Sequence, residues 1–426
     1  MYCVTITKAA KVQRLCEDAG MQDFRTMFAD SRFRRLWIAR LVSNLGNGMA
    51  PIALSFAVLG LPGANAASLG AVLAAQAVAI VLALPIGGVI ADRLPRALLV
   101  STTDLILGAF VVANGALFLT HHATVPIAMG IGIIGGILNA LWWPAFPGLV
   151  PALLDERSLQ RGNGLIGIAS NAGMIGGAAV AGGIITLWGA GAAIVLDGVS
   201  FLIAGALVFT LRHETPAQPS GESLIRDLHD GWRVFVSYRW LWVIVAVFGI
   251  VMAGMRGGFD VGGPVLMKTH FSGAASWAII QTGQTIGYLT GAVIATRIRP
   301  SRPLVLCLVV SVIIPIYLVA LAIPAPLPVL VLCAFLLGIC FDMWGVLWGT
   351  TMQTHIPRES LSRASAFDAM GSLLLGPVGM AVAGPVITAF GLRALFVGAA
   401  VLTAVFLVLP LFEPAVRNLR WVDPEA

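Results

Sequence analysis

Twelve long apolar segments divide this chain of 426 residues. Each is close to the roughly 20 residues that a helix needs to cross the hydrocarbon core of a bilayer. The composition agrees, because 58% of the residues are hydrophobic, 11% are charged, and the mean hydropathy is +0.92, which excludes a water-soluble globular protein. Since every backbone polar group in a bilayer needs an internal partner, we predict that these segments are helices. The predicted spans are 36–60, 67–91, 96–120, 124–148, 163–187, 190–211, 240–266, 273–296, 303–323, 327–351, 365–389 and 393–412.

Positive charge gathers on one side of these spans. Of the 26 Lys and Arg residues, 22 lie in the segments that share a side when the spans alternate in direction. Cytoplasmic loops of membrane proteins carry an excess of Lys and Arg, so we predict that both termini are cytoplasmic. Residues 1–35 are polar and amphipathic and lack the short apolar run of a cleavable signal.

The two halves of the chain repeat one another. Segment 179–186 recurs as segment 381–388, with six of eight positions identical. Such a duplication is the parallel repeat found in many secondary transporters, with six helices in each half. We predict a cytoplasmic segment 1–35, a six-helix bundle 36–211, a cytoplasmic linker 212–239 with an amphipathic surface helix, a second bundle 240–412 and a cytoplasmic tail 413–426.

The sequence gives no support to several other classes of function. Its basic residues are dispersed among short turns, so we expect no nucleic-acid partner. Three of its five cysteines lie inside apolar spans, and neither Cys nor His residues have the spacing of a metal site. It lacks the phosphate-binding loop and the nucleophile motifs of common enzymes. We therefore expect no enzymatic activity, no cofactor and no metal, and transport driven by a gradient.

The loop between the second and third spans reads Gly-Gly-Val-Ile-Ala-Asp-Arg-Leu-Pro-Arg. Gly87 and Gly88 would let a neighbouring helix approach closely. Asp92 would face a helix N-terminus, where negative charge is favoured. Arg93 and Arg96 would hold the turn on the cytoplasmic side.

This loop resembles the loop-2/3 signature of the major facilitator superfamily. Three further stretches resemble the branch of macrolide-efflux proteins and enterobactin exporters, drug:proton antiporter family 3. They are 33–46, 144–163 and 196–201, and the likeness extends over 30–412. The resemblance implies an all-α membrane protein in which 12 helices form two pseudo-symmetric six-helix bundles. It also implies that loop 2/3 locks the outward-facing state by contact between spans 2 and 11.

Charged residues at membrane depth are the strongest candidates for function, because each costs roughly 2.5–3.5 kcal/mol to insert without compensation. Arg256 and Asp260 are four residues apart in the seventh span and can pair. Six Gly and Pro residues surround them, which predicts a bent or interrupted helix beside a cavity. The pair is either a substrate- or proton-responsive switch or a structural bridge between the two halves.

Asp342 lies near the middle of the tenth span, with no basic residue within one helical turn. Apolar surroundings favour the neutral form of a carboxyl group, which suits a group that binds and releases a proton in each cycle. The alternative is an Asp packed against Trp344 without such a role. Asp342 is our first choice for proton coupling.

Arg40 and Asp104 lie one to two turns inside the cytoplasmic ends of spans one and three. At about 1.5 Å per residue their depths are comparable, so an inter-helix pair is feasible. That pair would either stabilise a gate or have a purely structural role. Asp368, near the start of the eleventh span, is expected to favour a helix N-terminus.

Uncharged polar and aromatic residues at depth are expected to line a central cavity for an amphipathic organic substrate. Alternatively, several of them hold helices together by hydrogen bonds. The predicted cavity residues are Asn44, Asn47, Gln76, Asn139, Trp142, Asn171, Phe259, Gln281, Gln284 and Trp344.

These observations favour a proton-driven exporter of small amphipathic compounds in a bacterial cytoplasmic membrane. Its expected partners are the small-molecule substrate, protons and the lipid bilayer, and we expect a monomer. Asn47 stands where relatives often carry an acid, and Ala178 follows Gly177 where antiporters have proline. These departures leave open an importer or facilitator. A transporter-like sensor without flux is a further alternative.

Overall fold

The structure is a computed structural model that describes residues 27–155, 158–213, 224–323 and 325–421. Within these ranges every regular element is helical. The predicted all-α class is therefore confirmed. Side chains of a few helical residues, Asp92 among them, lie outside the described part of the chain.

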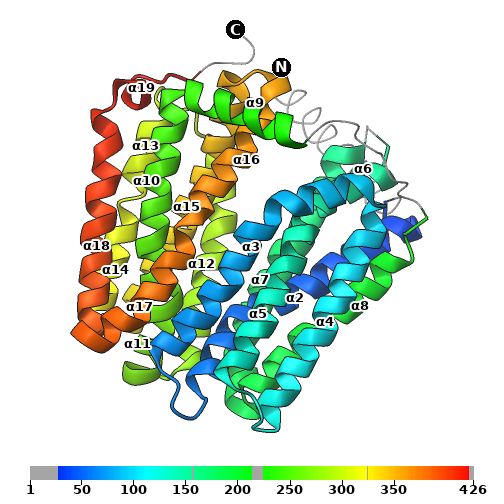
Figure 1. Cartoon of the computed structure of the whole chain (residues 1–426), viewed down its shortest axis with the longest axis vertical. Helices are drawn as coiled ribbons and strands as arrows, with labels where there is room; N and C mark the ends of the chain where they lie inside the picture. The colour runs from blue at the N-terminus through cyan, green and yellow to red at the C-terminus, as the bar shows by residue number, and fades with distance from the viewer. Residues whose placement is uncertain (1–26, 156–157, 214–223, 324, 422–426) are drawn as a thin grey trace, which may run out of the picture.

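The first half of the chain forms one group of helices and the second half forms another (Figure 1). The first group contains α2 (Ser31–Leu59), α3 (Ala66–Arg93), α4 (Arg96–Leu119), α5 (Val125–Ala145), η1 (Phe146–Gly148), α6 (Leu149–Leu153), α7 (Leu159–Trp188) and α8 (Ala190–Phe209). After α9 (Leu224–Ser237), the second group contains α10 (Arg239–Arg256), η3 (Gly257–Gly262), α11 (Gly263–His270), α12 (Ala274–Ala295), α13 (Pro303–Val310), α14 (Ile313–Ala322), α15 (Leu327–His355), α16 (Arg358–Leu374), α17 (Gly376–Phe390), α18 (Leu392–Val408), η4 (Leu409–Phe412) and α19 (Pro414–Arg417).

Eleven helical segments among the described residues are long and apolar enough to cross a bilayer. Their positions follow the predicted spans closely. The remaining predicted span is α12, which has 22 residues but carries Gln281, Gln284 and three threonines that reduce its hydropathy. It packs against α7 and α15. Each of its threonine hydroxyls donates to a carbonyl one turn earlier in the same helix, which lowers the cost of placing it in a bilayer.

The first spanning helix begins five residues before its predicted start because Asp30 caps it. The Asp30 carboxylate accepts a hydrogen bond of 2.8 Å from the backbone N–H of Arg32. The Arg32 guanidinium also donates to this carboxylate, at 2.9 Å, and these contacts hold the pKa of Asp30 below its usual range. The cap satisfies an N-terminal donor that would otherwise be unpaired.

Two predicted spans are interrupted where proline removes a backbone hydrogen bond. The ninth span is interrupted at Ser311, between α13 and α14. In a continuous helix the Ser311 carbonyl would accept a hydrogen bond from the backbone N–H of residue 315, but that residue is Pro315, which has no N–H. The eleventh span is broken at Leu375, two residues before Pro377. Both segments agree with the predicted spans. The interruptions within them were not predicted, and they arise because the prolines act on the preceding turn.

Glycine allows the helix backbones within each bundle to touch. A Cβ on Gly48 of α2 would collide with the Met174 carbonyl of α7, and one on Gly177 would collide with the Leu45 carbonyl. The second bundle has an equivalent pair of close contacts between α12 and α15, at Gly287 and Gly338. Small residues are the usual means of tight helix packing in lipid, where no hydrophobic force drives association.

The two bundles meet at the end of the molecule where α11 lies, and their ribbons diverge toward the end that carries α6 and α9 (Figure 1). We call these the α11 end and the α9 end. The seam between them consists of α3 against α17 and α7 against α12. A Cβ on Gly70 would collide with the Met380 carbonyl, and one on Gly182 would lie 2.8 Å from the Cα of Ala275.

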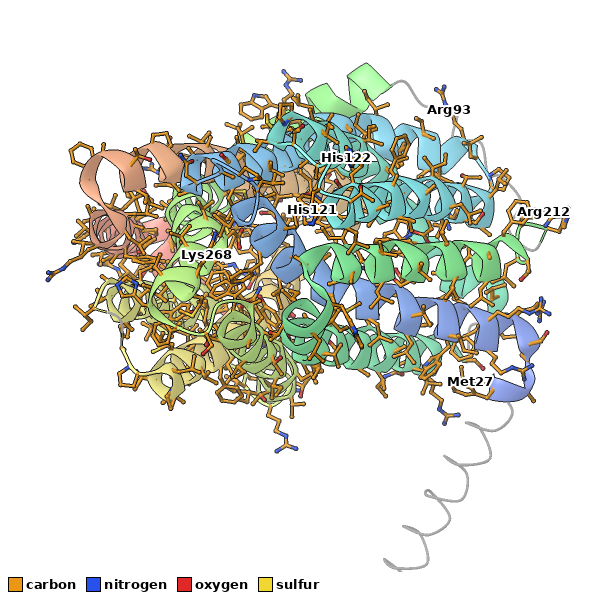
Figure 2. The ribbon with its side chains drawn as sticks, turned by 90° about the horizontal axis from the view of Figure 1, so that it is seen from below. Met27, Arg93, His121, His122, Arg212 and Lys268 are labelled. Carbon is orange, nitrogen blue, oxygen red and sulfur yellow. The ribbon has the colours of Figure 1, made fainter. Side chains whose placement is uncertain are left out.

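Lys268 adds a polar contact to this seam. Its ammonium group donates a hydrogen bond to the Leu59 carbonyl at the C-terminus of α2, where positive charge is favoured. Figure 2 shows Lys268 on α11, seen from the α11 end. The contact joins the last turn of α11 in one bundle to the last turn of α2 in the other.

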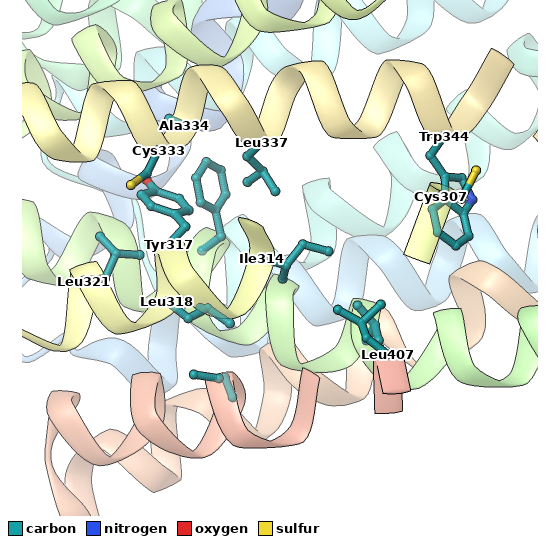
Figure 3. Packing of buried hydrophobic residues seen from close by; sticks show 14 of the residues in the cluster. Cys307, Ile314, Tyr317, Leu318, Leu321, Cys333, Ala334, Leu337, Trp344 and Leu407 are labelled. Carbon is teal, nitrogen blue, oxygen red and sulfur yellow. The ribbon is translucent and has the colours of Figure 1, made fainter. Parts of the chain in front are cut away.

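The second bundle has an extensive apolar core. Tyr317 of α14 packs toward α15, where Cys333 and Leu337 lie, whereas Leu318 lies on the opposite side of α14 (Figure 3). Leu407 belongs to the same cluster. The cysteines described here behave as small apolar residues in this core.

We predict that Gly177→Val destabilises the first bundle, because the new side chain must displace the Leu45 carbonyl of α2. Overpacking of this kind costs about 1–3 kcal/mol. The melting temperature of the detergent-purified protein measures the effect. Gly167→Val is the matched control on the same helix, since a Cβ there meets no atom within 4 Å. Equal melting temperatures for the two variants would contradict the role of Gly177.

Candidate functional site

The first bundle holds a polar cluster on α2, α4, α5, η1 and α7, which we call the N-terminal polar cluster: Arg40, Asp104, Trp142, Phe146 and Ser170. Arg40 Nε donates a hydrogen bond of 2.8 Å to Ser170 Oγ. Its guanidinium lies 5.0 Å from the centre of the Trp142 ring and 4.6 Å from that of Phe146. These rings are stacked 4.6 Å apart, so Arg40 has a cation–π partner on two elements.

Asp104 is the acid of this cluster, with only 3% of its surface exposed. Arg40 and the indole of Trp142 are its polar neighbours. The Trp142 nitrogen is buried without a hydrogen bond of standard geometry in the described structure. Arg40 and Asp104 are thus electrostatic neighbours, but no ion pair within 4 Å joins them among the described residues. Ser170 and the two rings hold the guanidinium instead.

The second bundle holds a membrane-depth ion pair. Arg256 Nη1 lies 3.1 Å from Asp260 Oδ2, which confirms the predicted pairing. The predicted interruption is also confirmed, because residues Gly257–Gly262 form the π-helix η3 between α10 and α11. The side chains are 42% and 26% exposed, so neither is sealed in the core. A π-helical turn within an α-helix is frequent at functional sites.

The helix break in α16 and α17 packs against this π-helix. A Cβ on Gly379 of α17 would collide with the Ala253 carbonyl of α10, and one on Gly257 would lie 2.6 Å from the Gly379 carbonyl. Gly376, at the break itself, lies beside the Arg256 side chain. Two irregular segments from different spans therefore contact one another beside the ion pair.

Two further residues complete what we call the C-terminal charged cluster: Arg256, Asp260, Tyr288 and Asp342. Asp342 of α15 faces α12, since a Cβ on Gly291 would lie 3.1 Å from the Cβ of Asp342. Tyr288, three residues before Gly291, shares that face of α12. Its hydroxyl interacts electrostatically with Asp260, Arg256 and Asp342. Sequence reasoning missed Tyr288, although it is one of only four tyrosines and lies within a polar span.

Several predicted cavity residues form their side-chain hydrogen bonds within their own bundle. Asn44 donates to the Arg40 carbonyl at 2.8 Å and packs against Gly173 of α7. Asn139 donates to the Gly135 carbonyl, one turn earlier in its own helix, at 2.9 Å. Here the alternative role, joining or stabilising helices, describes the contacts better.

Other predicted cavity residues lie in the packed core of the second bundle. Phe259 is 5% exposed and packs against Trp277 and Tyr317. Trp344 is 7% exposed and stacks on Phe248 at 5.2 Å. Neither is an open cavity wall in this conformation, because aromatic neighbours cover both rings.

The remaining predicted cavity residues are not brought together with the clusters by any described contact. Gln76 packs beside α5, and Gln284 is buried at the contact with α15. The Gln281 side-chain oxygen is buried without a described partner. Asn47 on α2 and Asn171 on α7 are half-buried.

Some of the loop-2/3 residues make close contacts in the structure and others do not. Gly87 makes the predicted close approach, since a Cβ there would collide with the Ala140 carbonyl of α5, whereas Gly88 faces open space and makes none. Arg96 lies 3.4 Å from the Gly148 carbonyl of its own bundle, and the Arg93 side chain is exposed. The side chain of Asp92 lies outside the described residues.

Asp368 has a different place from the one we predicted. α16 begins at Arg358, so Asp368 lies ten residues inside the helix rather than at its start. Its carboxylate accepts hydrogen bonds from Trp348 Nε1 at 2.9 Å and from Ser372 at 3.3 Å. Asp368 thus joins α16 to α15.

Comparison with known sequences gives a consistent picture. The Major Facilitator Superfamily profile matches residues 36–368. The chain is 26% identical over 408 residues to the multidrug efflux pump Tap of Mycolicibacterium fortuitum, covering 89% of this chain and 95% of that protein. It is 25% identical over 355 residues to the uncharacterized MFS-type transporter YkuC of Bacillus subtilis (strain 168), covering 80% and 82%.

Solved structures share the fold. A point mutant of the nucleoside transporter NupG superposes with a TM-score of 0.65 at 16% identity, over 89% of this chain and 99% of that one. A POT family transporter in complex with 5-aminolevulinic acid gives a TM-score of 0.70 at 12% identity, over 90% and 96%. The family match covers most of the chain, and the helical architecture agrees with it, so this protein is a member of the major facilitator superfamily.

Proposed function

We propose that this secondary transporter exports small amphipathic compounds from the cytoplasm in exchange for protons. The likeness to multidrug efflux pumps supports the direction, and the resemblance to drug:proton antiporter family 3 supports the coupling ion. The observation that carries the proposal is the C-terminal charged cluster, because ionisable residues inside a membrane are costly and typically mark proton relays or substrate pathways. We take the working unit to be a monomer.

The distribution of basic residues supports the sidedness of the proposal. With the Lys- and Arg-rich segments in the cytoplasm of a bacterial cell, the α9 end is cytoplasmic and the α11 end is outside. The contacts at the α11 end then correspond to an inward-facing conformation. In the outward-facing conformation the bundles separate there and approach at the α9 end, where loop 2/3 locks them.

In this cycle the charged cluster couples protonation to bundle movement. A proton on Asp260 removes the negative charge that holds Arg256, and a proton on Asp342 removes a negative charge near Tyr288. The irregular turns at η3 and at the α16–α17 break lack a continuous helical ladder, so they can change shape when that bond is released. Tyr288 interacts electrostatically with both acids, and its hydroxyl can both donate and accept a proton, which suits a relay from one acid to the other.

A second candidate is an importer or uncoupled facilitator. Asn47 and Ala178 favour it, since both depart from the antiporter pattern at positions in α2 and α7. Flux measurements separate the two, because only the antiporter accumulates substrate against a gradient when a pH difference is imposed.

We predict that Asp342→Asn abolishes accumulation driven by a pH gradient while substrate counterflow continues, because an amide cannot carry the proton. Uptake of a panel of drugs and siderophores into inverted vesicles, with and without the gradient, measures both activities. Asp342→Glu, which keeps the carboxyl group, is the matched control and should retain coupling. Undiminished accumulation by the Asn variant would assign the proton to Asp260 or Asp104 instead.

We predict that Arg256→Gln and Asp260→Asn each destabilise the protein, since each leaves one charge unpaired at a cost of roughly 2.5–3.5 kcal/mol. The double variant removes both charges, so it should recover the melting temperature but not the transport. This combination distinguishes a functional pair from a structural one. Normal transport by the double variant would mean that the pair only holds the helices together.

A further inference from the structure

A groove of about 440 Å³ runs along the seam between the two bundles, where α7 meets α12. One wall belongs to the first bundle and the other to the second, with one residue of α15 at its edge. The lining residues are Ala179, Gly182, Gly183, Ala275, Ala278, Ile279, Thr282, Gly283, Ile286 and Val331.

The groove offers no free polar group to a ligand. Thr282 carries the one polar side chain of the lining, and its hydroxyl already donates to the Ala278 carbonyl at 2.8 Å. The remaining lining atoms are apolar side chains and glycine backbone on helices whose amides are paired internally. An apolar space of this kind does not hold ordered water well, because water needs two or more polar partners.

The groove opens to the lipid-facing surface. Ile279 and Ile286 line it and are 50% and 43% exposed, as expected of side chains that point into the bilayer. Val180 and Leu187 on the adjoining turns of α7 are likewise 49% and 73% exposed. The groove is therefore a recess in the surface that already contacts hydrocarbon.

We propose that this groove binds one acyl chain of a bilayer phospholipid. The surrounding medium supplies that occupant, the lining matches its chemistry, and the small residues on α7 leave room for it. A chain in the groove contacts both bundles at once and fills space that packing leaves open, which gains dispersion contacts. This inference rests on membrane insertion and not on the substrate or the coupling ion.

Gly183 provides a direct test, because it lines the groove and a Cβ there meets no atom within 4 Å, so a larger side chain can extend into the groove. Gly398 on α18 is the matched control, since its Cβ also meets nothing within 4 Å. The two residues lie at comparable distances from the α11 ends of their helices. Only Gly183 lines the groove.

The experiment uses the full chain in phosphatidylethanolamine vesicles that contain a phospholipid with a photoactivatable diazirine in its acyl tail. After irradiation, mass spectrometry locates the adducts. We expect adducts to concentrate in segments 179–183 and 275–286, and to fall about tenfold in Gly183→Leu, the loss that corresponds to a tenfold weaker site. Gly398→Leu should match the unchanged protein.

Adducts spread evenly over the lipid-facing helices, or an unchanged pattern in Gly183→Leu, would overturn the proposal in favour of ordinary bulk-lipid contact. Melting temperatures verify that both variants fold. If Gly183→Leu fails to fold, Ala179→Leu fills the same groove from an exposed position one turn away and gives the same readout.

Discussion

Direct backbone contact between helices is the interaction on which this structure depends. In a bilayer the lipid tails are as apolar as the side chains, so helices associate through close packing rather than through the hydrophobic effect. Gly48 and Gly177 bring α2 and α7 together, and Gly287 and Gly338 do the same for α12 and α15. At the α11 end, Gly70 and Gly182 allow the same close backbone contact across the seam. The contact between the bundles therefore depends on glycine in the same way as the contacts within each bundle.

Such a joint determines what can move. Backbones in contact through glycine can separate without breaking many side-chain interactions. The polar contact of Lys268 with Leu59 is a single, partly buried hydrogen bond. The C-terminal charged cluster adjoins this joint, because η3 contacts α3 and Val261 packs with Leu69 and Met380. It also lies beside two segments whose helical ladder is already interrupted. A change of charge at Arg256 and Asp260 therefore acts where the backbone is most easily reshaped.

Much of this architecture could be predicted from the sequence, because hydropathy, charge asymmetry and the internal repeat are collective properties of many residues. The Arg256–Asp260 pair could be predicted because spacing along one helix fixes its geometry. The break at Leu375 was not predicted, although Pro377 can be read in the sequence, because a proline disturbs the helical turn that precedes it. Tyr288, Trp348 with Asp368, and the open position of Gly88 depend on contacts between distant helices, which spacing along the chain does not determine.

The central claim is that the two bundles exchange contacts between opposite ends of the molecule. Double electron–electron resonance tests it in a variant with the native cysteines replaced and spin labels at two exposed pairs. One pair, Arg93→Cys and Arg297→Cys, reports on the α9 end, and the other, His122→Cys and Phe390→Cys, on the α11 end. The account predicts that lowering the pH shortens the distances of one pair and lengthens those of the other. Distances that stay fixed at both ends, or that change in the same sense, would contradict it.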